Sequence, residues 1–179
     1  AEDNFTMKWN NKRIYLMNYN RYANEVFQGE QKNFAGKRIL LGISDAKQIK
    51  ALKSENSRYI LFKVNGNLWR YDQHDKKATC LFTFSDGSNE DVRADYKKHD
   101  VKVLSVTDEG NVDFLVYGYM NRGSHEGQMG VVFYHYDEEK RMVQEKFFVP
   151  VSTGFDQLGS DISTLAYLGD NGMTYLLLN

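Results

Sequence analysis

The chain has 179 residues, of which 41% are hydrophobic and 26% charged, the proportions of a globular domain. The formal net charge is −1, so we expect no nucleic-acid partner and no general attraction to an anionic membrane surface. One cysteine, Cys80, excludes an intrachain disulfide framework and a multi-cysteine metal site. No apolar run approaches the ~20 residues of a membrane span, and no Pro-rich linker divides the chain. We therefore expect one domain, 1–179, without membrane insertion.

Residues 4–44 predict four strands, at 5–9, 13–19, 24–28 and 37–43. Aromatic residues make up 14% of the chain, which favours strands over helices.

Residues 45–98 predict a second set of four strands, at 48–53, 58–64, 68–71 and 79–84. Asn65-Gly66 is a strong signal for a two-residue hairpin turn between the middle strands. The first strand has an alternative, because Ser44-Asp45 can cap a helix and the following residues are good helix formers. Residues 45–53 therefore predict either a strand or a short helix.

Residues 99–155 carry the clearest pattern, with strands at 101–106, 112–120, 130–136 and 142–151. The second is apolar or aromatic at nearly every position, which indicates that both of its faces are covered. The fourth alternates apolar and polar residues and ends near Pro150, as an edge strand does.

Two short motifs recur between these sets. Residues 71–77 and 136–141 both read Tyr-Asp followed by a charged stretch, and each stands between a third and a fourth strand. Residues 108–115 and 170–177 both read Asp-x-Gly-x-x-x-aromatic-Leu, and the second belongs to a final hairpin over 162–178. The matches indicate three repeats of about 50 residues followed by one hairpin.

The Tyr-Asp motif and the Asp-x-Gly turns resemble the blade repeats of β-propellers, in the general plan of bacterial extracellular propellers. The chain has no Trp-Asp dipeptide, so it departs from the WD group. The resemblance implies an all-β fold of antiparallel four-stranded meanders and a scaffold for binding. A nonrepetitive β-sandwich or barrel is the alternative. Either the chain is a segment of a longer propeller, or the final hairpin pairs with the first repeat.

The loop over 121–130 is the most unusual segment, because it combines glycines with Arg122, His125 and Glu126. In a meander this loop emerges at the same end as the connections between repeats, one of which carries Asp156. Arg122 suits a carboxylate or sulfate, and His125 with Glu126 suits acid–base chemistry. We take these four residues as the candidate ligand-binding site. The alternative is a solvated loop.

Other candidates are weaker. Residues 85–91 resemble a Ca²⁺ loop but lack its central glycine and its final acidic ligand. The four histidines have no metal-ligand spacing, His135 suits a hydrogen-bonded strand position, and Cys80 suits a small core residue. We predict no metal, no cofactor and no catalytic residue.

These patterns favour a non-catalytic binding or protein-interaction module of an exported or surface-exposed bacterial protein, with a protein, peptide or glycan as ligand. One alternative is a glycan hydrolase or lyase that draws a carboxylate pair from Glu126, Asp156 and Asp86. The other is a structural spacer, which would have no concave face.

Overall fold

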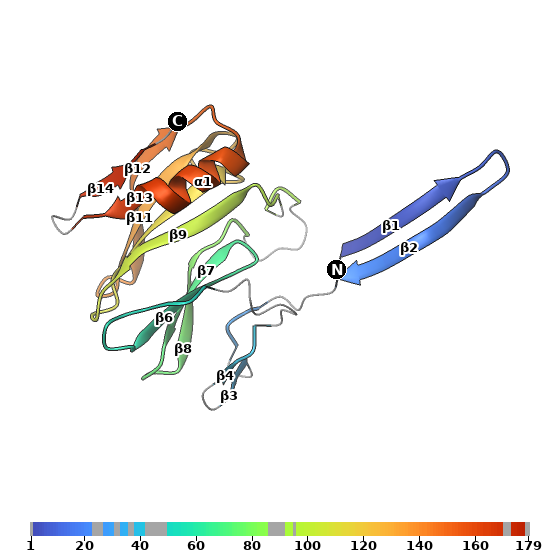
Figure 1. Cartoon of the computed structure of the whole chain (residues 1–179). Coiled ribbons are helices and arrows are strands. Elements are labelled where there is room, and N and C mark those ends of the chain that lie inside the picture. The colour runs from blue at the N-terminus through green and yellow to red at the C-terminus, as the bar shows by residue number, and fades with distance from the viewer. Residues whose placement is uncertain are drawn as a thin grey trace. The chain divides into compact units, whose positions relative to one another are not determined.

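The computed structural model describes residues 2–22, 27–30, 33–35, 38–41, 50–85, 92–94, 96–169 and 173–177. These residues form strands and one helix, so the predicted all-β class with four-stranded antiparallel sheets is confirmed (Figure 1). The chain divides into two compact units, Ala1–Gln48 and Ile49–Asn179, and each is described by itself. That the whole chain is one domain stays a prediction.

The first unit contains an antiparallel hairpin of β1 (Glu2–Trp9) and β2 (Ile14–Tyr22). The Asn10 side chain holds its turn by accepting hydrogen bonds from the backbone N–H groups of Lys12 and Arg13, both at 3.0 Å. This hairpin confirms the strands predicted at 5–9 and 13–19.

The remainder of the first repeat differs from the expectation. A short pair of β3 (Phe34–Ala35) and β4 (Arg38–Ile39) forms a separate two-stranded sheet. Of the strand predicted at 24–28, residues 27 and 28 are not in a strand, and the others lie outside the described residues. Of the strand predicted at 37–43, residues 38 and 39 are confirmed, 40 and 41 are not in a strand, and 37, 42 and 43 lie outside the described residues.

The second unit contains two four-stranded antiparallel sheets, each a meander. The first sheet consists of β5 (Leu52–Lys53), β6 (Tyr59–Val64), β7 (Asn67–Asp72) and β8 (Lys77–Phe82). Asn65 and Gly66 join β6 to β7 with φ angles of 52° and 78°, the left-handed conformations that the predicted turn needs. Residues 52–53 are a strand and 50–51 are neither helix nor strand, so a helix is not found there; residues 45–49 lie outside the described part.

The second sheet consists of β9 (His99–Val106), β10 (Val112–Tyr119), β11 (Met129–Asp137) and β12 (Met142–Pro150). Its strands lie within two residues of the predicted bounds. β12 lies at the sheet edge, as the alternation in 142–151 indicated.

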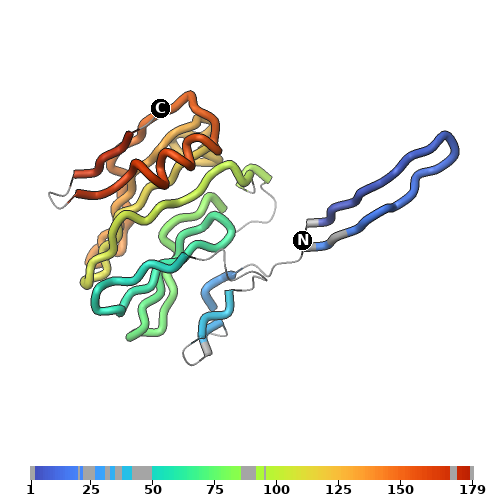
Figure 2. Tube along the Cα trace, in the orientation of Figure 1, coloured from blue at the N-terminus to red at the C-terminus, as the bar shows by residue number. Residues whose placement is uncertain are grey.

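The two sheets pair their third and fourth strands in the same register, so the chain follows the same path twice (Figure 2). The five pairs between β7 and β8 recur between β11 and β12 with both partners 65 positions later, and the bulge recurs at the same place. The first set is Asp72↔Lys77, Tyr71↔Ala78, Arg70↔Thr79, Trp69↔Cys80 and Leu68↔Phe82; the second is Asp137↔Met142, Tyr136↔Val143, His135↔Gln144, Tyr134↔Glu145 and Phe133↔Phe147.

The turns of this strand pair also repeat. Asp72 accepts a backbone hydrogen bond from Asp75 at 3.1 Å, and Asp137 accepts one from Lys140 at 3.0 Å. The last residue of each turn, Lys76 or Arg141, has a positive φ, 50° and 52° respectively. The recurrent Tyr-Asp motif therefore encodes one turn structure used twice.

The two sheets stack with the same orientation. The face of the first sheet that meets the second sheet is not the register-equivalent of the face that it meets. Leu68 of β7 packs in the core between the sheets. Phe133 holds the same register position in β11, but it packs in a second core on the far face of the second sheet. Conversely, Tyr136 packs in the inter-sheet core, while its counterpart Tyr71 points away from Leu68 across β7. Each sheet therefore turns the same face towards the next layer.

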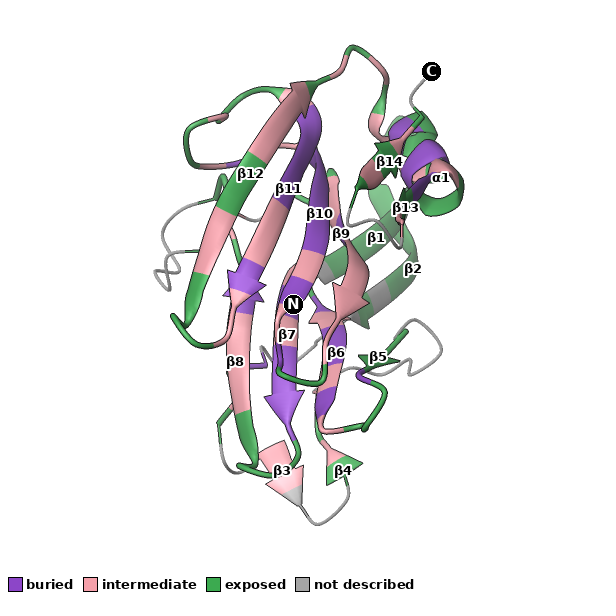
Figure 3. Ribbon diagram, turned by 90° about the vertical axis from the view of Figure 1, so that its left-hand side faces the viewer, coloured by how far each residue is buried: buried purple, intermediate pink, exposed green. Residues whose placement is uncertain are grey.

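The far face of the second sheet is covered by α1 (Phe155–Leu165) and the hairpin of β13 (Ala166–Leu168) with β14 (Thr174–Leu176) (Figure 3). Leu158 and Ile162 of α1 pack on Leu115 of β10. With both faces covered, β10 is buried along nearly its whole length, as its apolar sequence predicted.

The helix corrects the prediction that a strand begins at residue 162. Phe155, Leu158 and Ile162 recur at helical spacing, so one stripe of the segment can cover a flat apolar sheet face. The final hairpin exists, but its first strand is shorter than predicted because residues 162–165 belong to α1. In its second strand, residues 173 and 177 are not in a strand, and residue 178 lies outside the described residues.

Lys102 of β9 ties α1 to the sheet. Its Nζ donates to the carbonyl oxygens of Ile162 at 2.7 Å, Ser163 at 3.1 Å and Ala166 at 2.6 Å. These carbonyls close the C-terminal end of the helix, where a positive charge is favourable. Burial lowers the pKa of Lys102.

Arg70 ties the two sheets together. Its guanidinium donates to the Gly110 carbonyl at 2.9 Å and pairs with Glu138 at 2.7 Å. The same group lies over the rings of Tyr59 and Tyr136, 4.7 and 4.8 Å from their centroids. Burial and a hydrogen bond to Glu138 raise the pKa of Tyr136 to about 12.

Candidate functional site

The connection between β10 and β11, residues 120–128, is a closed loop held by its own backbone. Met120 N–H donates to the Gln128 carbonyl and Gly127 N–H to the Met120 carbonyl, both at 2.9 Å. Gly127 has a φ of 85°, a conformation that glycine adopts without strain. The loop is thus a defined element and not an open connection.

The segment that leads into β9 packs against the end of β10. Tyr119 N–H donates to the Lys98 carbonyl at 2.8 Å. A Cβ at Gly118 would stand 2.3 Å from that same carbonyl oxygen, so glycine is needed there. The β10–β11 loop and the inter-sheet segment therefore meet at one end of the second sheet, as meander geometry predicted.

These two segments line an open pocket of about 420 Å³, within the size range of small-molecule sites. We call it the loop-end pocket. Its lining residues are Val92, Arg93, Tyr96, Tyr119, Asn121 and Glu126.

Asn121 is the buried polar residue of the pocket wall, with 1% of its surface exposed. Its Nδ2 donates to the backbone carbonyls of Tyr96 at 2.9 Å and Ala94 at 3.3 Å. Because two carbonyls fix the amide nitrogen, the assignment of Oδ1 is determined. Oδ1 is buried and has no hydrogen-bond partner among the residues that the structure describes. A buried acceptor without a donor is costly, and a bound N–H or O–H group would relieve that cost.

Arg93 and Glu126 form an ion pair across the pocket at 2.6 Å. Both side chains are substantially exposed, so the pair adds little to stability and its groups can exchange partners with a ligand. The pair places one donor-rich and one acceptor-rich group at the same opening.

Tyr96 and Tyr119 supply aromatic surface. Their rings meet edge to face with centroids 5.1 Å apart, and Tyr96 is 50% exposed. His99 contacts the backbone of this segment, with Nδ1 3.0 Å from the Tyr96 carbonyl oxygen. Burial lowers the pKa of His99, which favours the neutral ring at pH 7.

The predicted site residues do not form one cluster. Glu126 lines the pocket, whereas Arg122, His125 and Asp156 are not among the lining residues. Arg122 is half-buried. Asp156 lies in the first turn of α1, 92% exposed and 4.0 Å from Lys98.

His125 and Glu126, named together for acid–base chemistry, have different partners in the structure. His125 Nε2 lies 2.7 Å from Glu145 of β12, and its ring stacks on Phe148 with centroids 3.9 Å apart. Glu126 instead pairs with Arg93. His125 therefore anchors the loop to the sheet edge.

Sequence reasoning missed Arg93, Tyr96 and Tyr119, and it named the loop that holds Asn121 without selecting that residue. The sequence carried one signal for the two tyrosines. They adjoin the β10–β11 loop and the inter-sheet segment, the two connections that were expected to meet at one end of the sheet. The expected strand position of His135 is confirmed, with Nδ1 2.7 Å from Asp113. Cys80 is half-buried, and burial raises the pKa of its thiol.

Across the residues that the structure describes, no group of three or more His, Cys, Asp or Glu side chains could hold a metal ion. Within the same residues, no helix has the length and apolar character needed to cross a bilayer. Asp86 and most of the 85–91 loop lie outside the described residues. Comparison with models of protein families, with curated proteins and with solved structures gave no match.

Proposed function

We propose that this chain is a non-catalytic binding module that holds its ligand in the loop-end pocket. The observation that carries the proposal is Asn121, which lines the loop-end pocket and whose buried Oδ1 has no donor within the described part of the chain. A ligand that donates an N–H or O–H group to this oxygen would gain a hydrogen bond that the free protein lacks.

The remaining lining residues define the ligand chemistry. Tyr96 and Tyr119 suit an apolar face, and Arg93 with Glu126 suits neighbouring polar groups. A glycan segment combines an apolar ring face with several hydroxyl groups, and it is the ligand we propose.

A propeller-like scaffold is part of the same proposal. It is supported by the repeated register of the two sheets and by their stacking in the same sense. In such an architecture the connections between second and third strands share one end with the connections between sheets, where binding residues gather. Export to a bacterial surface stays a prediction.

The two alternatives receive less support. A hydrolase needs two cooperating carboxyl groups, and Glu126 is bound to Arg93 while Asp156 neighbours Lys98. A spacer would lack a concave face, whereas this chain has the loop-end pocket.

The test is a binding screen of the full chain against glycan and peptide libraries, with Tyr96→Ala as the pocket variant. Tyr175→Ala is the matched control, because Tyr175 is a similarly exposed tyrosine of β14. We expect glycan binding that Tyr96→Ala weakens at least about tenfold, the effect of losing roughly 1.4 kcal/mol of contact. Binding to peptides alone, no binding to either library, or equal binding by the two variants would contradict the proposal.

A further inference from the structure

His99 and Asn121 donate hydrogen bonds to the same acceptor, the backbone carbonyl of Tyr96. His99 Nδ1 lies 3.0 Å from this oxygen, and Asn121 Nδ2 lies 2.9 Å from it. A carbonyl oxygen only accepts, so Nδ1 carries the proton of the neutral His99 ring and Nε2 carries its lone pair. The shared carbonyl therefore joins the first residue of β9 to the wall of the loop-end pocket.

The Nε2 atom of His99 faces the turn between β6 and β7. A Cβ placed on Gly66 would stand 2.8 Å from Nε2, so only glycine leaves room for the half-buried ring. The CH2 group of Gly66 accepts no hydrogen bond, and a lone pair can face it without loss. A protonated Nε2 would need an acceptor. To present that N–H to water the ring must turn, and Nδ1 then leaves the Tyr96 carbonyl.

We propose that His99 positions the wall of the loop-end pocket while its ring is neutral and releases that wall when the ring is protonated, so that mildly acidic pH weakens ligand binding. This role rests on the function proposed above, since Tyr96 and Asn121 line the same pocket. His99 is not among the lining residues and acts through the Tyr96 carbonyl, so it is a positioning residue. Imidazole suits the role because its ordinary pKa lies close to neutral pH.

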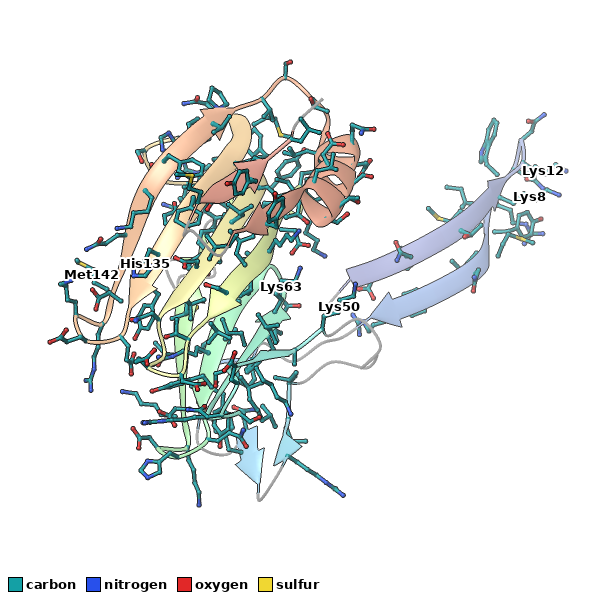
Figure 4. All side chains as sticks on the ribbon, turned by 60° about the vertical axis from the view of Figure 1, so that its left-hand side comes forward. Lys8, Lys12, Lys50, Lys63, His135 and Met142 are labelled. Carbon is teal, nitrogen blue, oxygen red and sulfur yellow. The ribbon has the colours of Figure 1, made fainter. Side chains whose placement is uncertain are left out.

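Asp100, the next residue of β9, is the acidic group that acts on His99. Its carboxylate accepts two bonds from Lys63 of β6 (Figure 4), at 2.7 and 2.8 Å. It accepts a third from the hydroxyl of Tyr117 in β10, at 3.1 Å. Because Asp100 is already paired with a lysine, it offers an imidazolium at His99 only partial compensation.

The other described residues around the ring supply no negative charge. Phe84, after β8, meets the imidazole edge to face with ring centroids 4.7 Å apart. The β6–β7 turn presents Gly66 and the β10–β11 loop presents Asn121, and neither titrates. Lys98, which precedes the ring in the chain, carries a positive charge. These surroundings favour the neutral imidazole.

The sign of the pH effect follows from burial. Burial lowers the pKa of His99, while its bond to the Tyr96 carbonyl and the charge of Asp100 raise it in part. A histidine with a lowered folded pKa binds fewer protons in the folded than in the unfolded state, so its contribution to stability is complete above about pH 6.5. That contribution is lost as pH falls from this value through the folded pKa. The wall should therefore loosen on the acidic side of neutrality.

Heteronuclear NMR of the ligand-free full chain from about pH 8 to about pH 5 tests the proposal. One readout is the titration of the His99 ring. The other is the protection of the Asn121 side-chain amide from hydrogen exchange, relative to the intrinsic rate at each pH. We expect the protection to fall at least about tenfold with the midpoint of the His99 titration, as loss of the positioning bond would cause.

Two substitutions separate the ring proton from the hydrogen bond. His99→Asn keeps a donor nitrogen at the place of Nδ1 but does not titrate, so the protection of Asn121 should persist throughout the pH range. His99→Leu removes the donor and should lower the protection at every pH. His135→Asn is the matched control, because His135 is a half-buried histidine that bonds Asp113 and should leave the wild-type response unchanged.

The glycan library, screened at about pH 7.5 and about pH 5.5, connects this response to binding. A glycan that the wild type binds at the higher pH should bind at least about tenfold more weakly at the lower pH, and His99→Asn should not show this difference. If no glycan binds at either pH, the proposed function fails, while the NMR titration still decides whether His99 positions the wall.

Three results would overturn the proposal. Protection of Asn121 that stays constant while His99 titrates shows that the ring does not hold the wall. A His99 ring that is still neutral at about pH 5 shows that it does not respond in the mildly acidic range. A pH response that persists in His99→Asn, or that disappears in His135→Asn, shows that another group is responsible.

Discussion

The first and second sheets share the register of their third and fourth strands, but they differ at the connection between their second and third strands. In the first sheet Asn65 and Gly66 make this connection alone. In the second sheet residues 120–128 make it, and they contribute Asn121 and Glu126 to the loop-end pocket. The framework is repeated while one connection is longer, and the longer connection contributes part of the candidate site.

The equivalent faces of the two sheets provide a second contrast. The face that the first sheet turns towards the second carries Leu61 and Leu68 and packs on another sheet. The equivalent face of the second sheet carries Phe133 and packs on α1. The same face of one meander can therefore be covered by a sheet or by a helix, provided that the cover presents an apolar stripe.

Phe114→Ala should give the largest change in the free energy of unfolding, and it tests whether the two sheets share a core. Phe114 is fully buried in the inter-sheet core and stacks on Tyr134 with centroids 5.5 Å apart. Its truncation should lower the free energy of unfolding by about 3–5 kcal/mol, through lost burial and the cavity left behind. Urea denaturation followed by far-UV circular dichroism measures the change.

Met142→Ala is the control for that measurement. Met142 lies at the start of β12 in the same sheet (Figure 4), where it is exposed. Its truncation should change the free energy of unfolding by less than about 0.5 kcal/mol. Equal effects of the two substitutions would mean that the two sheets do not share a core.

Lys102→Met would test whether Lys102 holds the C-terminal end of α1 on the second sheet. The substitution keeps an apolar stem but removes three hydrogen bonds to the carbonyls that end α1. We expect a loss of about 1–2 kcal/mol in the stability of the helix end. Amide hydrogen exchange should accelerate in α1 and remain slow in β10.

The control is Lys146→Met, which removes an exposed lysine from β12 that bonds only Gln144 among the contacts described for it. Exchange in α1 that is equally fast in both variants, or unchanged in Lys102→Met, would show that Lys102 does not hold the helix.

Much of the second unit was predictable because its signals are local. Strands such as β6 and β10 follow from runs of apolar and aromatic residues bounded by turn residues, and Asn65-Gly66 specifies its turn by backbone conformation. The Tyr-Asp motif was recognisable because one turn recurs with the same hydrogen bonds. The helix α1 was missed because Gly159, Ser160 and Thr164 are poor helix formers, and tertiary packing of Leu158 and Ile162 overrides them.

The site was less predictable because its contacts depend on which residues of neighbouring strands and connections come to lie next to the loop. Glu145 reaches His125 from the neighbouring strand, and Arg93 reaches Glu126 from the connection between sheets. Both partners are distant in sequence, and neither follows from the composition of the loop. The orphaned oxygen of Asn121 depends on the positions of two backbone carbonyls, which no sequence pattern reports.

Asp72→Asn and Asp137→Asn compare the repeated turn itself and should give the smallest effects. Burial raises the pKa of Asp72, but hydrogen bonds from Arg58 and from two backbone N–H groups lower it further, so its pKa lies below the usual value. A hydrogen bond from Lys140 lowers the pKa of Asp137. Asp72→Asn should cost about 1–2 kcal/mol at pH 7, since its side chain is nearly buried and bonded to Arg58. Asp137→Asn should cost less, because its partner Lys140 is mostly exposed.

The pH dependence of these two variants distinguishes charge from turn geometry. A carboxyl group with a lowered folded pKa binds fewer protons in the folded than in the unfolded state, so its contribution is complete above the unfolded pKa of about 3.9. That contribution is lost as pH falls through the folded pKa. The difference in urea midpoint between wild type and Asp72→Asn should therefore be constant from neutral pH down to about pH 4 and shrink below it. A difference that persists unchanged at pH 2 would mean that Asp72 acts only as an acceptor for the backbone of its turn. The motif would then be conformational and not electrostatic in the first sheet.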